Sequence, residues 1–121
     1  VYDAGEEKIF ALRTGFRAKY IIDAARRVAT DGSFLPSVAA CGSYSDADAM
    51  LRQICGVGPK VAACTLLFGF GRTDAFPIDV WIRRVMQKYF PQGLDPAVWG
   101  DFAGIAQQYL FYYERYVGGQ A

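Results

Sequence analysis

The stretch LRQICGVGPKVAACTLLFGF, residues 51–70, decides the fold of this chain. A helix-forming run ends near Ile54, a Gly-Val-Gly turn follows, and an apolar run begins at Pro59. Proline suits the first position of a helix, because its missing N–H would have no partner inside the helix there. The stretch therefore predicts two helices joined by a tight turn, a helix-hairpin-helix. The second helix is apolar almost all round, so we expect it to be deeply buried.

The rest of the chain also favours helices, and no segment alternates apolar and polar residues as a half-buried strand does. Gly32 suits the C′ position that ends a helix. Ser45 with Asp48 resembles a capping box at the start of the next helix. Asp79 and the Asp95-Pro96 pair predict two further helix starts. The sequence thus predicts an all-α fold with helices over about residues 6–13, 15–31, 45–54, 59–69, 79–90 and 95–116, and a connector with about one turn of helix over residues 33–44.

Length and composition indicate one helical domain over residues 1–121, with 53% hydrophobic residues available for a core. The chain starts at Val1 inside a charged, helix-like run, and we expect it to be the C-terminal part of a longer protein. Its formal charge is only +1, so charge alone does not indicate a DNA-binding domain. Basic residues do cluster near Arg17 and near Arg83, as phosphate-binding patches or as solvated helix faces.

The residue types present argue against several kinds of site. The chain contains no histidine, which excludes histidine-based triads and histidine zinc ligands. Three cysteines without a CxxC spacing argue against a disulfide framework, a structural zinc site and an iron–sulfur cluster, so we expect no bound metal. No apolar run is long enough to span a bilayer, and we expect no membrane partner.

The turn Gly56-Val57-Gly58 is a candidate DNA-binding site. Glycines permit positive φ angles and close approach of the backbone, so the N–H groups of the turn can converge on one anion. The N-terminus of the following helix adds its dipole, and a DNA phosphate fits such a site with little side-chain charge. The alternative is an ordinary helix–helix turn.

Lys60 and Asp79 are the candidate catalytic residues. A cation in the first turn of a helix is mildly unfavourable, and partial burial also favours the neutral amine, which could attack a sugar carbon and form a Schiff base. The alternative is a surface lysine, whose cost is only about tenths of a kcal/mol. Asp79 is a good N-cap residue, and a carboxylate fixed in that way also suits stabilising an oxocarbenium ion and handling protons.

Together with DAFPIDVWIRRV, residues 74–85, the hairpin stretch is similar to the helix-hairpin-helix DNA glycosylases that end in a Gly/Pro-rich loop and a catalytic aspartate. Within that superfamily the chain most resembles the 8-oxoguanine DNA glycosylase/AP lyase family, over about residues 12–111. The resemblance places the lysine in the second helix of the hairpin, at Lys60, and the aspartate nineteen residues later, at Asp79.

The resemblance also implies a pocket for the flipped base. Cys64, one helical turn after Lys60, would pack against one face of the base. AQQYLF, residues 106–111, resembles the motif of the last helix, in which Gln107 would bind the Watson–Crick edge and Phe111 would stack on the other face. Taken singly, each residue also has an ordinary structural explanation: Cys64 as a small buried residue, Gln107 as a surface amide and Phe111 as a core aromatic.

GFRAKY, residues 15–20, resembles the family segment that enters the DNA stack. It implies that Phe16 is a wedge and that Arg17 contacts the base opposite the lesion. Trp81 departs from the family pattern, since some members carry a histidine there against a backbone phosphate. The resemblance implies no cofactor; the one exception it leaves open is a monovalent or divalent cation bridging the hairpin and a DNA phosphate.

We therefore expect a monomeric base-excision-repair enzyme, in the cytoplasm or nucleoid of a prokaryote or in the nucleus of a eukaryote. It would flip oxidised guanine out of duplex DNA, remove it through a Lys60 Schiff base and cleave the strand by β-elimination. Three alternatives remain: a helix-hairpin-helix module that only binds DNA, an alkylbase glycosylase that needs no lysine, and an endonuclease III-like enzyme, which typically adds a four-cysteine cluster after its last helix.

Overall fold

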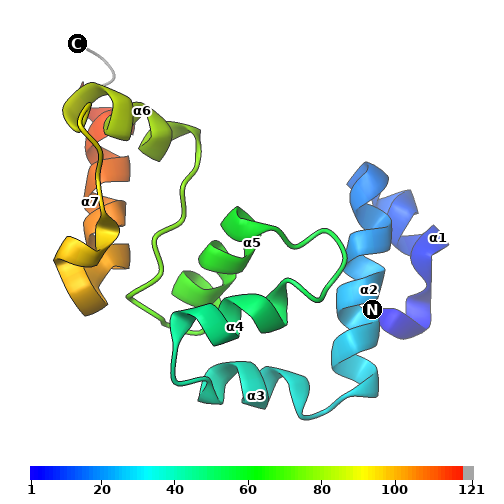
Figure 1. Cartoon of the computed structure of the whole chain (residues 1–121). Helices are drawn as coiled ribbons and strands as arrows, with labels where there is room; N and C mark the ends of the chain where they lie inside the picture. Colours follow the sequence, from blue (N-terminus) through cyan, green and yellow to red (C-terminus); the bar gives the residue numbers. More distant parts are fainter. Residues whose placement is uncertain (119–121) are drawn as a thin grey trace. The chain divides into compact units, whose positions relative to one another are not determined.

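A computed structural model describes residues 1–118, and all regular secondary structure in this range is helical, as predicted (Figure 1). The helices are η1 (Tyr2–Ala4), α1 (Glu6–Ile9), η2 (Phe10–Thr14), η3 (Gly15–Arg17), α2 (Ala18–Thr30), α3 (Phe34–Ala40), α4 (Tyr44–Leu51), α5 (Pro59–Cys64), η4 (Thr65–Gly69), α6 (Val80–Tyr89), η5 (Pro96–Phe102) and α7 (Ala103–Tyr116). Among them η2 and η4 are π-helical, and η1, η3 and η5 are 3-10 helices.

The chain forms two compact units, Val1–Gly58 and Pro59–Ala121. The first unit contains α1 to α4, and Phe34 and Val38 are among its fully buried side chains. The second unit contains α5 to α7, with Leu66, Ile82 and Val85 fully buried. The prediction of one helical domain over residues 1–121 stays a prediction.

Two features of the first unit differ from the prediction around residues 31–44. Gly32 is not a C′ residue of positive φ, because the chain leaves α2 at Asp31 in an extended conformation (φ −131°, ψ 93°). The predicted connector contains α3, which with 7 residues is longer than the single turn of helix expected there and buries Phe34 and Val38 one turn apart on one face. Pro36 does not prevent this helix, because it lies in the first turn, where its missing N–H breaks no hydrogen bond.

Helix α4 begins two residues earlier than predicted. Its N-cap is Ser43, whose hydroxyl accepts a hydrogen bond from the N–H of Asp46 at 3.2 Å, so the predicted capping box at Ser45 is wrong. The helix ends at Leu51, and a turn leads to the glycines of the hairpin. The hydroxyl of Ser43 thus supplies the acceptor that the first N–H groups of a helix need.

Helix α5 begins at Pro59, as predicted, but it is buried on one side only. In α5, Ala62 and Ala63 are buried, whereas Val61 is 48% exposed; in η4, which continues the predicted helix, Leu66 is buried and Phe68 is 64% exposed. The prediction of a deeply buried, all-round apolar helix is therefore wrong for the described residues, because the composition of a helix does not say how many of its faces are covered.

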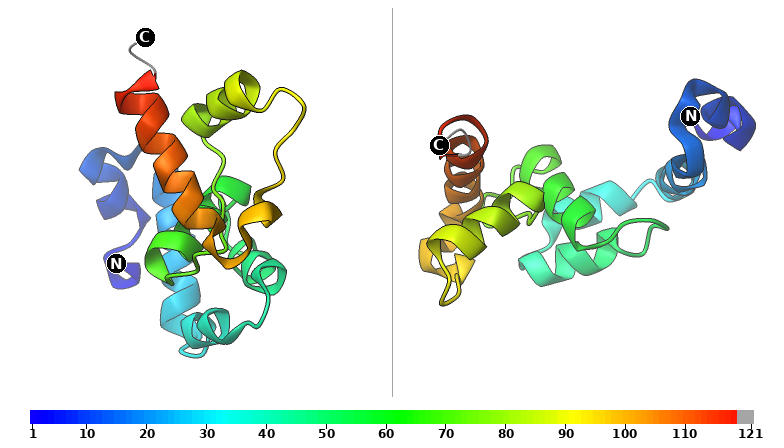
Figure 2. Two further views of the ribbon diagram at one scale, coloured as in Figure 1. Left: turned by 90° about the vertical axis from the view of Figure 1, so that its left-hand side faces the viewer. Right: turned by 90° about the horizontal axis from the view of Figure 1, so that it is seen from above.

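The last predicted helix is divided in two. The Asp95 carboxylate accepts a hydrogen bond from the N–H of Ala97 at 3.0 Å and Pro96 follows it, which confirms the predicted start. Gly100, inside η5, adopts a positive φ of 54° and kinks the chain there, and α7 begins at Ala103. Helices α6 and α7 pack against each other (Figure 1, Figure 2).

Gly104, in the first turn of α7, lies against the loop that connects η4 to α6. Its N–H donates to the carbonyl of Thr73 at 2.6 Å, and an added Cβ would lie 2.6 Å from the carbonyl oxygen of Ala75 and from Cδ1 of Leu67. We expect Gly104→Ala to destabilise the protein by about 1–3 kcal/mol through overpacking. Denaturant unfolding measures this, with Gly58→Ala as a control that meets no atom within 4 Å. Equal losses in both variants would contradict the packing argument.

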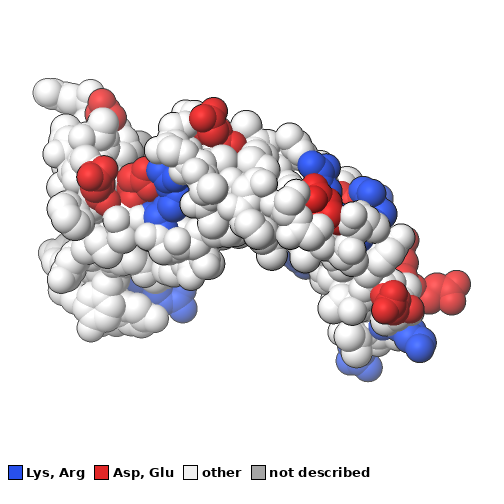
Figure 3. All heavy atoms as spheres, turned by 90° about the horizontal axis from the view of Figure 1, so that it is seen from below, with Lys and Arg blue, Asp and Glu red and all other residues white. Residues whose placement is uncertain are grey.

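No helix among residues 1–118 combines the length and the apolar character needed to cross a bilayer. On the face drawn in Figure 3, basic and acidic side chains are interspersed and most of the surface is uncharged. This distribution agrees with the formal charge of +1.

Candidate active site

Asp79 is the N-cap of α6, as predicted. Its Oδ1 accepts a hydrogen bond from the N–H of Ile82 at 2.9 Å, and its backbone is extended (φ −101°, ψ −171°). Asp79 is half-buried, and its Oδ2 has no hydrogen-bond partner within residues 1–118. The cap therefore fixes the carboxylate with one oxygen and leaves the other available to a ligand.

The loop before Asp79 is held at two points. Arg72 donates to the Asp74 carboxylate from Nε at 3.1 Å and from Nη2 at 2.9 Å, and this guanidinium lowers the pKa of Asp74 below its usual value. The Thr73 carbonyl accepts from Gly104 of α7, and the Thr73 hydroxyl donates to the carbonyl of Asp101 at 2.6 Å. These contacts join the loop to the start of α7.

Gln107 is buried, with 3% of its surface exposed, so the interpretation as a surface amide is wrong. Its Nε2 donates to the carbonyl of Pro77, two residues before Asp79, at 3.0 Å, and its Oε1 accepts from Nε2 of Gln108. The structure thus connects Gln107 to the segment that carries the catalytic candidate. Because a glutamine amide has two N–H donors, one of them has no acceptor within residues 1–118 and could contact a ligand.

Lys60 and Cys64 lie one turn apart on α5, which places them on the same side of that helix. Cys64 is half-buried and is a free thiol. Lys60 is exposed, so the expected partial burial of its side chain is wrong. Within residues 1–118 no hydrogen bond or ion pair joins Lys60 to Asp79.

Phe111 is half-buried on α7, four residues after Gln107. It is one of the residues that line a groove of about 380 Å³, together with Ile105, Gln108, Tyr109, Tyr112 and Tyr116. Tyr109 is 77% exposed, whereas Gln107 on the opposite side of the helix is buried. Phe111 therefore lies at the border between the covered and the open side of α7.

Two arginines lie over the ring of Trp81, the residue that departs from the family pattern. The guanidinium carbon of Arg84 is 4.7 Å from the ring centroid, and that of Arg115, on α7, is 5.4 Å from it. Neither arginine forms an ion pair within the described part of the chain. Cation–π contacts of this kind hold the guanidinium groups against the indole.

In the first unit, the hairpin turn has two free donors. Gly56 adopts a positive φ of 85°, which favours glycine, but Gly58 does not. The N–H of Val57 donates to the carbonyl of Ile54 at 3.1 Å and is therefore not available to an anion, which corrects its predicted role as a donor. Within residues 1–118 the N–H groups of Gly56 and Gly58 have no acceptor.

Phe16 and Arg17 lie in η3, directly before α2. Phe16 is 66% exposed, as a wedge requires, and its ring contacts that of Tyr20 edge-on with centroids 6.1 Å apart. The guanidinium of Arg17 lies 4.9 Å from the centroid of Phe16. The ring of Tyr20 in turn packs against Gly56, where an added Cβ would lie 2.7 Å from its Cδ1 and Cδ2. Tyr20 thus brings together the two predicted DNA-contacting segments of this unit.

The structure adds residues that sequence analysis did not assign to the site. Three features join segments that are distant in the sequence: the carbonyl of Pro77 bonds Gln107, Gly104 lets α7 approach the loop before α6, and the ring of Tyr20 packs on Gly56. For Gly104, the signal in the sequence is a glycine in the first turn of an otherwise regular helix, which often marks a close approach. No local pattern indicates the other two contacts.

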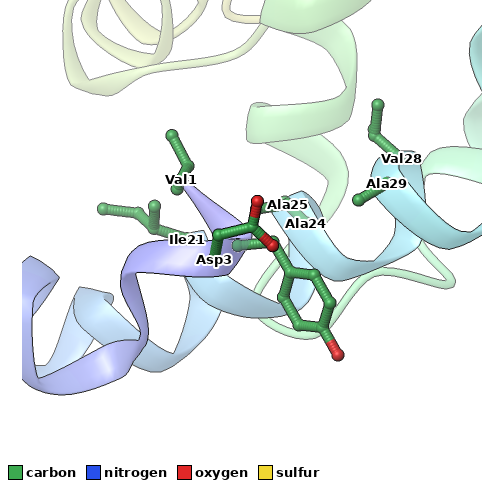
Figure 4. Close-up of a pocket in the computed structure, with 8 residues that line it drawn as sticks. Val1, Asp3, Ile21, Ala24, Ala25, Val28 and Ala29 are labelled. Carbon is green, nitrogen blue, oxygen red and sulfur yellow. The ribbon is translucent and has the colours of Figure 1, made fainter.

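A groove of about 540 Å³ in the first unit, lined by apolar side chains of α2 and by Val1, Tyr2 and Asp3, contains none of the predicted site residues (Figure 4). The described residues contain no group of three or more His, Cys, Asp or Glu side chains that could hold a metal ion.

Known proteins with similar sequences are DNA glycosylases. No family model matches the chain. It is 39% identical over 113 residues to a probable N-glycosylase/DNA lyase of Methanothermobacter thermautotrophicus, covering 86% of this chain and 36% of that protein. The chain therefore spans little more than a third of the length of this relative.

Solved structures agree with the sequence comparison. MBOgg1 in complex with a low-affinity DNA ligand matches with a TM-score of 0.83 and 42% identity, over 94% of this chain and 42% of that one. The Clostridium acetobutylicum 8-oxoguanine glycosylase/lyase, bound to duplex DNA with cytosine opposite 8-oxoguanine, matches with a TM-score of 0.80 and 32% identity, over 92% and 41%. Together with the capped Asp79 and the hairpin ahead of Lys60, these matches show that the chain belongs to the helix-hairpin-helix DNA glycosylases, in the 8-oxoguanine DNA glycosylase/AP lyase family.

Proposed function

We propose that this chain carries the catalytic residues of a bifunctional DNA glycosylase/AP lyase that removes 8-oxoguanine from duplex DNA. The observation that carries the proposal is Asp79, an N-cap with one free carboxylate oxygen, nineteen residues after a lysine in the first turn of the second hairpin helix. A module that only binds DNA needs neither residue, and an alkylbase glycosylase needs only the aspartate.

In the proposed reaction, the neutral amine of Lys60 attacks the anomeric carbon of the damaged nucleotide. The new C–N bond replaces the glycosidic bond, and the base leaves with the bonding electrons and takes up a proton. Opening of the sugar ring gives a Schiff base between Lys60 and the sugar. Loss of a proton from the neighbouring carbon then expels the 3′ phosphate, which cleaves the strand by β-elimination.

Asp79 would stabilise the positive charge that develops on the sugar while the glycosidic bond breaks. The hydrogen bond from Ile82 holds the carboxylate in place before the reaction, so little reorganisation is needed when the charge appears. The free Oδ2 is the atom available for this contact and for proton transfer with the Lys60 amine.

Cys64, Gln107 and Phe111 would bind the flipped base. A thiol and an aromatic ring would enclose its two faces, and the amide of Gln107 would bind its Watson–Crick edge. The bond from Gln107 to the Pro77 carbonyl would fix the amide in one orientation. Because 8-oxoguanine differs from guanine away from the Watson–Crick edge, Gln107 would select guanine-type bases over other bases.

The N–H groups of Gly56 and Gly58, the wedge Phe16 and the cation Arg17 would contact the duplex. The proposed enzyme acts as a monomer without an organic cofactor, on DNA in the nucleoid or in the nucleus. A monovalent or divalent cation between the hairpin turn and a DNA phosphate is compatible with this arrangement.

Borohydride trapping of the full-length protein on duplex DNA with 8-oxoguanine opposite cytosine tests the proposal. Reduction of a Schiff base gives a stable covalent adduct, which we expect for 8-oxoguanine and not for an undamaged duplex. Base release without an adduct would indicate a monofunctional glycosylase, and duplex binding without release would indicate a binding module. An adduct formed preferentially on an oxidised pyrimidine would favour the endonuclease III-like alternative.

We expect Phe111→Ala to weaken binding of the lesion by about ten- to a hundredfold, because stacking of a base on an aromatic ring contributes about 1–3 kcal/mol. Affinity for duplexes with and without 8-oxoguanine is measured in a Lys60→Gln background, so that the substrate is not consumed. Tyr109→Ala is the matched control, since it removes an exposed aromatic residue from the same helix. If both variants lose equal affinity for the lesion, Phe111 does not contact the base.

A further inference from the structure

One stripe of α2 holds the hairpin turn. Tyr20, Asp23 and Arg27 recur at a spacing that places them on one side of the helix. Each contacts a different residue of the segment 53–56: the Tyr20 ring lies over Gly56, Asp23 accepts from the N–H of Cys55, and Arg27 donates to Oε1 of Gln53. All these residues belong to the first unit.

The contact of Asp23 is made to the backbone of the turn. Its Oδ2 accepts from the N–H of Cys55 at 2.8 Å, and its Oδ1 forms an ion pair with Nη2 of Arg26 at 2.6 Å. Arg26 and, secondarily, the Cys55 N–H lower the pKa of Asp23 below its usual value, so the carboxylate is ionised at neutral pH. Each carboxylate oxygen thus has a partner.

The contact of Tyr20 fixes the shape of the turn. Gly56 has a φ of 85°, and the Tyr20 ring occupies the position that a Cβ of residue 56 would need. The ring of Phe16 contacts the same Tyr20 ring in an edge-to-face arrangement. The N–H groups of Cys55 and Val57 donate inside the protein, so in the described part of the chain the turn's N–H groups without an acceptor are those of Gly56 and Gly58.

We propose that Tyr20 and Asp23 are positioning residues that hold the hairpin turn so that the N–H groups of Gly56 and Gly58 can bind a DNA phosphate. Neither residue needs to touch DNA for this. The inference rests on the proposed function only in so far as the hairpin binds duplex DNA, and it adds an acidic residue that promotes binding of a polyanion.

The sign of the effect separates positioning from simple electrostatics. Removing a carboxylate makes the protein more positive, so electrostatics alone predicts tighter binding to DNA after Asp23→Ala. Positioning predicts weaker binding, because the turn loses the acceptor that fixes the Cys55 N–H. Asp23→Asn keeps an oxygen acceptor at that position and should retain the affinity.

The test measures the dissociation constant of the full-length protein for an undamaged duplex at one fixed salt concentration. We expect Asp23→Ala to weaken binding about five- to tenfold, as the loss of one ordered hydrogen bond does, and Asp23→Asn to bind at least as well as the wild type. Asp31→Ala is the charge-matched control, since Asp31 accepts from the Ser33 N–H at the far end of α2. If Asp23→Ala and Asp31→Ala have the same dissociation constant for the duplex, the positioning role of Asp23 is wrong.

A second pair of variants keeps the inference testable if Asp23→Ala does not fold. Tyr20→Phe keeps the ring over Gly56 and should bind like the wild type, whereas Tyr20→Leu leaves part of the space over Gly56 unfilled and should weaken duplex binding by about five- to tenfold. Equal affinity of the two Tyr20 variants would overturn the role of the ring.

Amide hydrogen exchange separates a local from a general structural role. We expect faster exchange in a peptide covering residues 52–58 of Asp23→Ala and unchanged exchange over α6 and α7. Faster exchange throughout the protein would overturn positioning in favour of a global loss of stability. Borohydride trapping of the wild type is measured separately from duplex affinity. A failure of the proposed reaction and a failure of the positioning role of Tyr20 and Asp23 can therefore be told apart.

Discussion

Lys60→Gln is expected to abolish both base release and borohydride trapping while leaving duplex binding within a few-fold of the wild type. The amide of glutamine is not a nucleophile and cannot form a Schiff base, so both chemical steps lose their reacting atom. Binding is retained because it depends on backbone N–H groups and on other cations, and one charge is a small part of the contact with DNA.

Single-turnover base release and adduct formation on an 8-oxoguanine duplex measure the loss, and the affinity for an undamaged duplex measures binding. Lys8→Gln removes the same charge from α1 and is the matched control, because Lys8 is exposed and lies far along the chain from the candidate site. If Lys60→Gln releases base at nearly the wild-type rate, Lys60 is not the nucleophile and Asp79 must activate water instead.

The exposure of Lys60 bears on how its amine becomes reactive. Partial burial was expected to favour the neutral amine of Lys60, but its side chain is exposed on α5. The remaining sources of activation are the dipole of the helix and the exclusion of water by a bound duplex. Exclusion of water by the duplex would add to the effect of the dipole when DNA binds.

The helix starts that depend on local capping chemistry could be predicted from the sequence. Pro59 begins α5, and Asp79 and Asp95 are N-caps whose carboxylates accept from backbone N–H groups close by in the sequence. These signals lie within a few residues of the feature that they specify, so no knowledge of the fold is needed to interpret them. The all-α class and the place of the hairpin follow from the same kind of signal.

Features set by contacts between distant segments could not be predicted. The hydrogen bond from Gln107 to the Pro77 carbonyl and the packing of Tyr20 on Gly56 join residues at least thirty positions apart. The positive φ of Gly100, which divides the last helix, has no signal beyond the glycine itself. A polar residue such as Gln107 suits a surface until its buried partner is known, and that partner is a backbone carbonyl without a sequence pattern.

Asp79→Asn is expected to lower the rate of base release by about a hundredfold or more, the contribution that a positioned acid or base usually makes. The substitution keeps an oxygen that can accept from the Ile82 N–H but replaces the other oxygen with a neutral donor. The loss of stability should therefore stay below about 1 kcal/mol, since asparagine caps a helix almost as well as aspartate.

The comparison with Asp95→Asn separates the two roles of Asp79. Asp95 is also an N-cap, and its carboxylate accepts a hydrogen bond from the N–H of Ala97. It has no assigned part in the reaction, so Asp95→Asn should leave the rate of base release unchanged. Single-turnover release from an 8-oxoguanine duplex and denaturant unfolding are measured for both variants. A large rate loss at Asp79 with matching small stability losses at both positions would make Asp79 a catalytic carboxylate that the helix holds in place. Equal rates for both variants would mean that Asp79 only caps α6. An anion other than the Asp79 Oδ2 would then have to stabilise the positive charge that develops on the sugar.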